Sequence, residues 1–154
     1  MYPTILWATD GSHEADVALH EALRLLEPGG RLIAFHCDQR FTGGRIGGLP
    51  VYPDETDRQR RIEERVEELR ADGVDVDLVF DSTSRDAASE IAAAAETAHV
   101  DAIVCGTRGL HGVVGFLNGR SAARVLRHAS VPVIVVPAHA PLHADPLETE
   151  GAPV

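Results

Sequence analysis

The residues most suited to chemistry are the glycines of the segment GTRGLHGVVGFLNGRSAARVL, at positions 106, 109, 112, 115 and 119. Glycine lets backbone N–H groups approach a phosphate because no Cβ atom stands in the way. The segment leads into a predicted helix, whose free N–H groups favour an anion, and Arg108 and Arg120 add charge-assisted donors. This spacing predicts a phosphate-binding loop. The same composition also fits a flexible turn in which Ser121 is an ordinary helix N-cap.

The elements that must hold this loop alternate along the chain. Short apolar runs predict strands at 4–9, 31–37, 74–80, 101–106 and 131–136, and amphipathic runs predict helices at 13–27, 54–72 and 85–98. The apolar residues Ala122, Val125, Leu126 and Ala129 mark a last helix. This order predicts βαβ units, and so one α/β domain with a five-stranded parallel sheet covered by helices on both faces, a Rossmann-like arrangement.

Ligands of such sheets bind beyond the carboxyl ends of the strands, where the strand order reverses. The predicted strand ends are Asp10, residues 36–38 and Gly106. The run at 74–80, VDVDLVF, alternates as an edge strand does. Residues 38–53 lack periodicity and predict a long mobile loop, and residues 138–154 predict a disordered tail.

Composition excludes several classes of partner. The formal net charge is -10 and no lysine occurs, which argues against nucleic acid and against anionic membranes. No apolar run approaches the roughly 20 residues that cross a bilayer, and the first residues do not resemble a secretory signal. We therefore expect a cytoplasmic protein. The eight histidines show no zinc-type spacing, so we expect them to be solvated surface residues and expect no metal site of the protein's own.

The glycine pattern is also specific enough to indicate a family. The sequence Gly106-x2-Gly109-x9-Gly119, followed by VLRHASVPVIVVP, and the opening TILWATDGS resemble the universal stress protein family. The resemblance implies a domain over residues 1–137 with an adenine nucleotide alpha hydrolase-like fold and strand order 3-2-1-4-5. Nucleotide-binding members bind ATP at the strand ends, commonly as homodimers, whereas other members lack the glycine loop.

The resemblance also implies a set of site residues. Ala8, Thr9 and Asp10 would line the adenosine side of the pocket, and the backbone around Cys37 would meet the adenine edge. The ribose and phosphate cradle would consist of Gly106, Arg108, Gly109 and Gly119. Asp10 would bond the nucleotide or a phosphate-bound Mg²⁺, or else would cap the first helix by accepting the amide of Ser12 or His13.

Arg120 departs from the family pattern, which has Ser or Thr directly after the last glycine. Here Arg120 occupies that place and Ser121 follows it. Arg120 would either replace the hydroxyl with a stronger ionic hydrogen bond or fill the phosphate site. The resemblance therefore implies a stress-related regulatory dimer that binds ATP, with Mg²⁺ brought by the phosphates. The alternative is the same fold acting as a protein-interaction module, because Arg120 blocks the phosphate site.

Three further expectations follow. An enzyme is not expected beyond slow ATP hydrolysis, for which His111 is the one histidine near the loop. The hydrophobic strand 131–136 lies at the sheet edge in this family and is expected to pair two copies of the chain. If the first strand lies between the second and fourth, Cys37 and Cys105 are roughly 9–10 Å apart, at about 4.8 Å per strand. That exceeds the roughly 7 Å limit for a disulfide, so both are expected to be free thiols.

Overall fold

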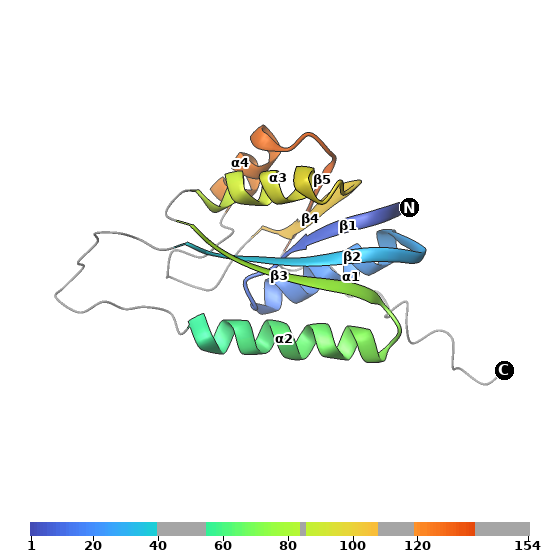
Figure 1. The fold of residues 1–154 in the computed structure, drawn as a ribbon. Helices are drawn as coiled ribbons and strands as arrows, with labels where there is room; N and C mark the ends of the chain where they lie inside the picture. The colour runs from blue at the N-terminus through green and yellow to red at the C-terminus, as the bar shows by residue number, and fades with distance from the viewer. Residues whose placement is uncertain (40–54, 84–85, 108–118, 138–154) are drawn as a thin grey trace.

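The computed structural model describes residues 1–39, 55–83, 86–107 and 119–137 (Figure 1). In chain order its elements are β1 (Tyr2–Ala8), α1 (His13–Leu25), β2 (Leu26–Gln39), α2 (Glu55–Ala71), β3 (Asp75–Thr83), α3 (Ala87–Thr97), β4 (Ala102–Gly106), α4 (Gly119–His128) and β5 (Val133–Val136). The strands form one parallel sheet in the order β3-β2-β1-β4-β5. This confirms the predicted α/β fold and strand order, with β3 at one edge as its alternation indicated.

The two faces of the sheet are covered by different helices. The chain steps from β1 through β2 to β3 in one direction, then returns to β4 and β5 on the other side of β1. Because parallel crossovers are right-handed, the two directions place their helices on opposite faces. Accordingly α1 and α2 pack on one face, and α3 and α4 on the other (Figure 1). The strand order reverses between β1 and β4.

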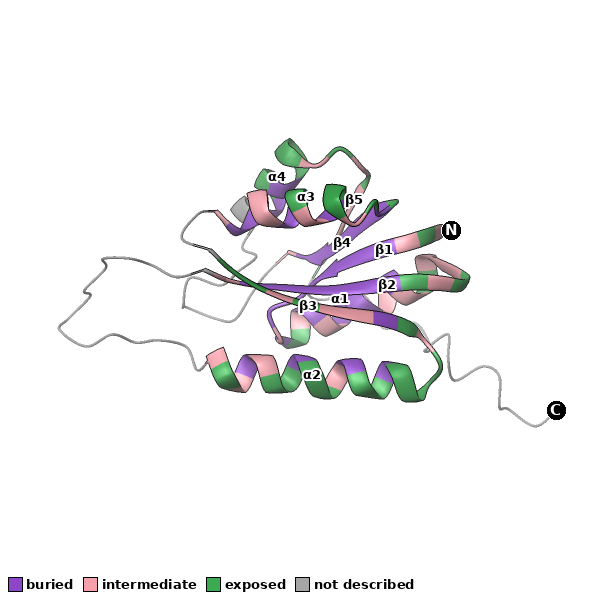
Figure 2. Cartoon of the chain, in the orientation of Figure 1, coloured by how far each residue is buried: buried purple, intermediate pink, exposed green. Residues whose placement is uncertain are grey.

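Strand β1 is the centre of both layers of core. Ile5 and Trp7 point to the layer under α1 and α2, and Leu6 and Ala8 point to the layer under α3 and α4. None of the four is exposed to solvent, and Figure 2 shows burial concentrated in the sheet and on the helix faces turned to it. The Trp7 indole Nε1 donates a hydrogen bond of 2.9 Å to the carbonyl of Ala15, so α1 is fixed to β1 by a polar contact as well as by packing.

Strand β2 is longer than the sequence predicts. The pattern Pro28-Gly29-Gly30 predicts a helix that ends at residue 27 and a strand that starts at 31, but α1 ends at Leu25 and β2 begins at Leu26. Tyr2 pairs with Leu26 and Thr4 with Arg31, so the proline and glycines bulge out within the strand. A Cβ atom on Gly30 would lie 2.8 Å from the carbonyl of Pro3, which explains the glycine there.

The predicted last helix is present as α4, on which Val125 is fully buried and Leu126 is 54% exposed. One other expectation changes. Asp38 and Gln39 extend β2 instead of opening a loop. The rest of the expected loop, 40–53, and the expected tail, 138–154, lie outside the described residues.

Candidate functional site at the carboxyl edge of the sheet

Buried polar residues follow β1 directly, at the point where the strand order reverses. Thr9 and Asp10 are both buried although they lie between a strand and a helix. The Thr9 amide donates to the carbonyl of Phe35 over 2.9 Å, and the Thr9 hydroxyl oxygen accepts the Gly11 amide over 3.1 Å. Gly11 has a φ of 75°, a left-handed conformation that favours glycine. These bonds fix the backbone of the turn from β1 into α1.

Asp10 uses one carboxylate oxygen and leaves the other without a partner. Its Oδ1 accepts the Ser12 amide over 3.0 Å, and Ser12 in turn caps α1 by accepting the Ala15 amide over 3.2 Å. Among the residues that the structure describes, Asp10 Oδ2 is buried and has no hydrogen-bond partner. Capping of the first helix, the structural role considered for Asp10, therefore accounts for Oδ1 only. An orphaned buried oxygen costs free energy, so Oδ2 is available to a donor from a ligand.

His36 is not among the site residues that the sequence predicts, yet it is 1% exposed at the end of β2. Its Nδ1 lies 2.9 Å from the carbonyl oxygen of Thr9, and its Nε2 lies 2.6 Å from Glu55 Oε1. A carbonyl only accepts, so Nδ1 carries a hydrogen, and another proton lies between Nε2 and the Glu55 carboxylate. The His36 and Phe80 rings are nearly perpendicular, with their centroids 6.1 Å apart. His36 thus joins the ends of β1 and β2 to the first residue of α2.

The expectation that the histidines are solvated is wrong for His36. The sequence carried a usable signal, because His36 lies inside the apolar run RLIAFHC, where neighbouring residues are buried on both faces of the sheet. A polar side chain in such a run needs hydrogen-bond partners. Thr9 and Glu55 supply them.

The two cysteines lie near this edge as free, buried thiols, as the strand order predicts. Burial raises the pKa of Cys37 to about 12, with a further increase from the charge of Asp81 on β3. Burial alone raises the pKa of Cys105 to about 11. Neither thiol is suited to nucleophilic chemistry at neutral pH. Cys37 can therefore contribute to the site only through its backbone and its volume.

The structure describes two glycines of the predicted loop: Gly106 at the end of β4 and Gly119 at the start of α4. A Cβ atom on Gly106 would lie 3.0 Å from the carbonyl oxygen of Glu14, so the first turn of α1 packs directly on the end of β4. The next amide, of Thr107, donates to the Val136 carbonyl over 3.0 Å and keeps β4 and β5 together. Trp7 pairs with Val104, which places Thr9 and Gly106 at the same level on adjacent strands.

The remaining predicted site residues are only partly visible. Ala8 is buried at the end of β1 beside Phe35, within one residue of Thr9. Arg108 and Gly109 lie outside the described residues. Gly119, Arg120 and Ser121 form the first turn of α4, and their side chains are outside the description. The structure therefore brings together Ala8, Thr9, Asp10, Cys37 and Gly106 at one edge of the sheet.

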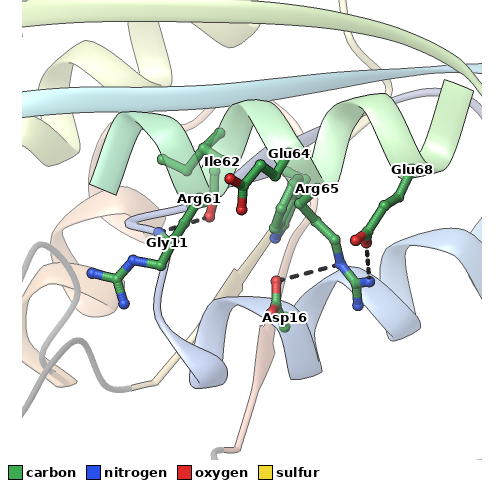
Figure 3. A pocket seen from close by; sticks show the side chains of 9 residues that line it. Gly11, Asp16, Arg61, Ile62, Glu64, Arg65 and Glu68 are labelled. Atoms are coloured by element: carbon green, nitrogen blue, oxygen red, sulfur yellow. Dashed lines mark hydrogen bonds and ion pairs between the residues drawn. The ribbon is translucent and has the colours of Figure 1, made fainter. Parts of the chain in front are cut away.

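A hollow of about 270 Å³ begins at Thr9 and Gly11 of this edge and runs between α1 and α2 towards Glu68 (Figure 3). Arg65 crosses it, with Nη1 2.8 Å from Glu68 and Nε 3.7 Å from Asp16. Burial raises the pKa of Asp16 even though Arg65 opposes this change. Some of the charged side chains that line the hollow thus form ion pairs with each other.

Two properties of the described residues bear on partners. No helix among them is both long and apolar enough to cross a membrane. Within the same residues, no three histidine, cysteine or acidic side chains gather in a way that would hold a metal ion.

Comparison with known proteins agrees with the fold. The model of the universal stress protein family matches residues 1–137. A putative universal stress protein from Staphylococcus haemolyticus is 31% identical over 148 residues, which cover 88% of this chain and 84% of the relative. A solved structure from the same family, from Burkholderia pseudomallei, is 28% identical, with a TM-score of 0.60 over 88% of this chain and 96% of its own.

Two more distant structures share the fold and contain adenine nucleotides. A universal stress protein in complex with cAMP has a TM-score of 0.63 at 20% identity, over 89% of this chain and 98% of its own. A family protein from Arabidopsis thaliana with AMP bound has a TM-score of 0.60 at 14% identity, over 89% and 92%. From the family model and the curated relative, together with the strand order, we conclude that this chain belongs to the universal stress protein family.

Proposed function

We propose that this protein binds ATP at the carboxyl edge of its sheet, between the ends of β1 and β4, and acts as a stress-related regulatory dimer. The glycine loop Gly106-x2-Gly109-x9-Gly119 would cradle the phosphates, which would bring Mg²⁺ with them. Ala8, Thr9, Asp10 and the backbone at Cys37 would line the adenosine side.

The observation that carries this proposal is the orphaned Oδ2 of Asp10. It is a buried acceptor at the point where the strand order reverses, which is where open α/β sheets bind their ligands. A ribose hydroxyl or a phosphate-bound metal ion would satisfy this oxygen, whereas a bare phosphate would be repelled by it. Asp10 therefore fits a nucleotide better than an inorganic anion.

Two further observations support a nucleotide. The absence of a side chain at Gly106 leaves α1 and the end of β4 in direct contact, so the loop starts beside Thr9 and Asp10. Relatives with the same fold have been solved with cAMP and with AMP. Both ligands carry adenosine, the part that Asp10 would recognise.

The first test is to denature the purified protein and analyse the released supernatant for nucleotide by chromatography. Titration calorimetry with ATP and Mg²⁺ then compares the wild type with Asp10→Asn and Gly109→Ala. We expect both variants to bind at least roughly ten times more weakly, because the asparagine amide would place a donor against a ligand donor and the added methyl group of alanine would crowd the phosphates. Binding that is equal in all three proteins would refute the assignment of this edge.

Arg120 decides between the proposal and its alternative. It follows Gly119 directly, in the place of the family's hydroxyl residue. If the wild type binds no ATP but Arg120→Ser binds it, the arginine blocks the phosphate site and the protein acts through protein contacts alone. If neither binds, nucleotide binding is refuted for this chain.

The proposed dimer uses β5. This strand is at the edge of the sheet, and Val133, Ile134 and Val135 are only partly buried in the single chain. An exposed apolar edge strand tends to pair with another copy. Light scattering should then give twice the chain mass of 16.5 kDa for the wild type and the chain mass for Val133→Lys, with circular dichroism as the check on folding. A monomeric wild type would refute the dimer.

A further inference from the structure

A buried arginine lies beside this edge without a counter-charge. Arg58, in the first turn of α2, is 8% exposed, on the helix face that also buries Ile62 and Val66. Its neighbours Arg60 and Arg61 both form ion pairs with Asp57. Among the residues that the structure describes, the Arg58 guanidinium forms no hydrogen bond or ion pair. An arginine cannot lose its proton in a protein, so Arg58 is a largely buried residue with a permanent charge and no counter-charge within this part of the chain.

Arg58 is placed close to the turn that carries Asp10. A Cβ atom on Gly11 would lie 3.2 Å from the carbonyl oxygen of Arg58 and 3.7 Å from its Cα. Three residues earlier, Glu55 begins α2 and reaches His36 at the end of β2. Long side chains of a helix lean towards its N-terminus, so we expect the guanidinium to extend towards the carboxyl edge of the sheet.

Two groups of opposite charge therefore lie near the same turn. Asp10 Oδ2 is a buried oxygen without a donor among the described residues, whereas no Arg58 nitrogen is both fully buried and unpaired, so the guanidinium remains open to solvent or to a ligand. A ligand that brings both a hydroxyl and an anionic group would satisfy both. A phosphorylated nucleoside carries these two groups on one ribose.

We propose that Arg58 is a phosphoryl-binding residue of this site: its guanidinium contacts a phosphoryl group of the bound nucleotide, while Asp10 accepts a ribose hydroxyl. This inference rests on the proposed nucleotide binding and adds a residue outside the glycine loop. Arg58 reaches the ligand from α2, on the side of β1 opposite to β4. It would also explain how a chain without lysine supplies a buried positive charge to a phosphate.

Arg58→Met tests the proposal, since methionine keeps much of the apolar stem and removes the charge. Affinity for adenosine should be unchanged, and affinity for at least one phosphorylated form should fall roughly 10- to 100-fold, the range of one charge-assisted hydrogen bond. Titration with 5′-AMP, ATP and adenosine 3′-phosphate identifies which phosphoryl group Arg58 contacts. The matched control is Arg61→Met, whose arginine is on the same helix, has a 44% exposed side chain and pairs with Asp57; it should bind every ligand as the wild type does.

A second measurement separates this role from a structural one. Without ligand, Arg58→Met should melt close to the wild type, because methionine keeps the apolar packing and the Arg58 nitrogens are not shut off from water. The phosphorylated form that Arg58 contacts should raise the melting temperature of the wild type more than that of Arg58→Met, whereas adenosine should raise both equally. If the wild type binds neither adenosine nor a nucleotide, the proposed function fails; if it binds them but Arg58→Met binds every phosphorylated form equally well, only the inference about Arg58 fails. A wild type that binds nucleotides no better than Arg58→Met, or an Arg58→Met that melts lower and loses adenosine equally, overturns the inference.

Discussion

The substitution His36→Leu tests whether a buried imidazole joins β1, β2 and α2. Leucine is close in volume, so the change removes the hydrogen bonds to Thr9 and Glu55 with little loss of packing. The bond to the Thr9 carbonyl contributes about 1 kcal/mol and the bond to the Glu55 carboxylate about 1.5–3 kcal/mol. Glu55 is 25% exposed, so water replaces part of the second bond. We therefore expect the free energy of unfolding to fall by about 2–3 kcal/mol.

Urea unfolding followed by circular dichroism measures this loss. For a single domain, the midpoint should fall while the slope with denaturant stays constant. The melting temperature should drop by roughly 5–10 °C for a chain of this length. His20→Leu is the matched control, because the Nδ1 of His20 is buried without a hydrogen-bond partner among the described residues and should cost less than about 0.5 kcal/mol. A loss below about 0.5 kcal/mol for His36→Leu, or an equal loss in the control, would refute the role of His36.

Three other predictions concern the same edge and its supports. At pH 8 the thiols of Cys37 and Cys105 should react about a thousand-fold and a hundred-fold more slowly in the folded than in the urea-unfolded protein, because burial raises their pKa values from 9.0 to about 12 and about 11. The unfolded chain loses these thiol protons at a lower pH than the folded chain does, so the free energy of unfolding should also fall as the pH rises above 9.0. Rapid labelling of the native protein would contradict the raised pKa values. Gly106→Ala should destabilise by about 1–3 kcal/mol in thermal unfolding, since its Cβ would lie 3.0 Å from the carbonyl oxygen of Glu14, and an unchanged melting temperature would show that α1 can move. Trp7→Phe should cost about 1–3 kcal/mol, because it removes the buried indole hydrogen bond from β1 to α1. Trp7 is the sole tryptophan, so circular dichroism is the measurement, and a loss no larger than that of a surface variant would contradict the prediction.

The fold was predictable because hydrophobic periodicity reports burial directly. Alternating apolar and amphipathic runs predict the parallel α/β class, whereas the strand order came from the resemblance to a family and not from periodicity. The start of β2 was not predictable in this way. Pro28 and the two glycines are typical of a turn between elements, but here they form a bulge within a strand, where Gly30 lies against the carbonyl of Pro3.

The candidate site was predictable in position and less so in its side chains. The strand ends locate Thr9, Asp10 and Gly106 correctly, because parallel strands end at one edge. His36 and Arg58 were missed because a charged or titratable residue type suggests solvent. Arg58 precedes Ile62 by four residues and so shares its buried helix face; spacing could have identified it where residue type could not.

The contact between His36 and Glu55 gives the protein a built-in spectroscopic label. The proton between the His36 imidazole and the Glu55 carboxylate, whose Nε2 and Oε1 atoms lie 2.6 Å apart, should give an NMR resonance downfield of the amide protons. Because the other ring nitrogen bonds the Thr9 carbonyl, any displacement of the end of β1 changes the shielding of that proton. One resonance would therefore report, variant by variant and ligand by ligand, whether the end of β1 has moved.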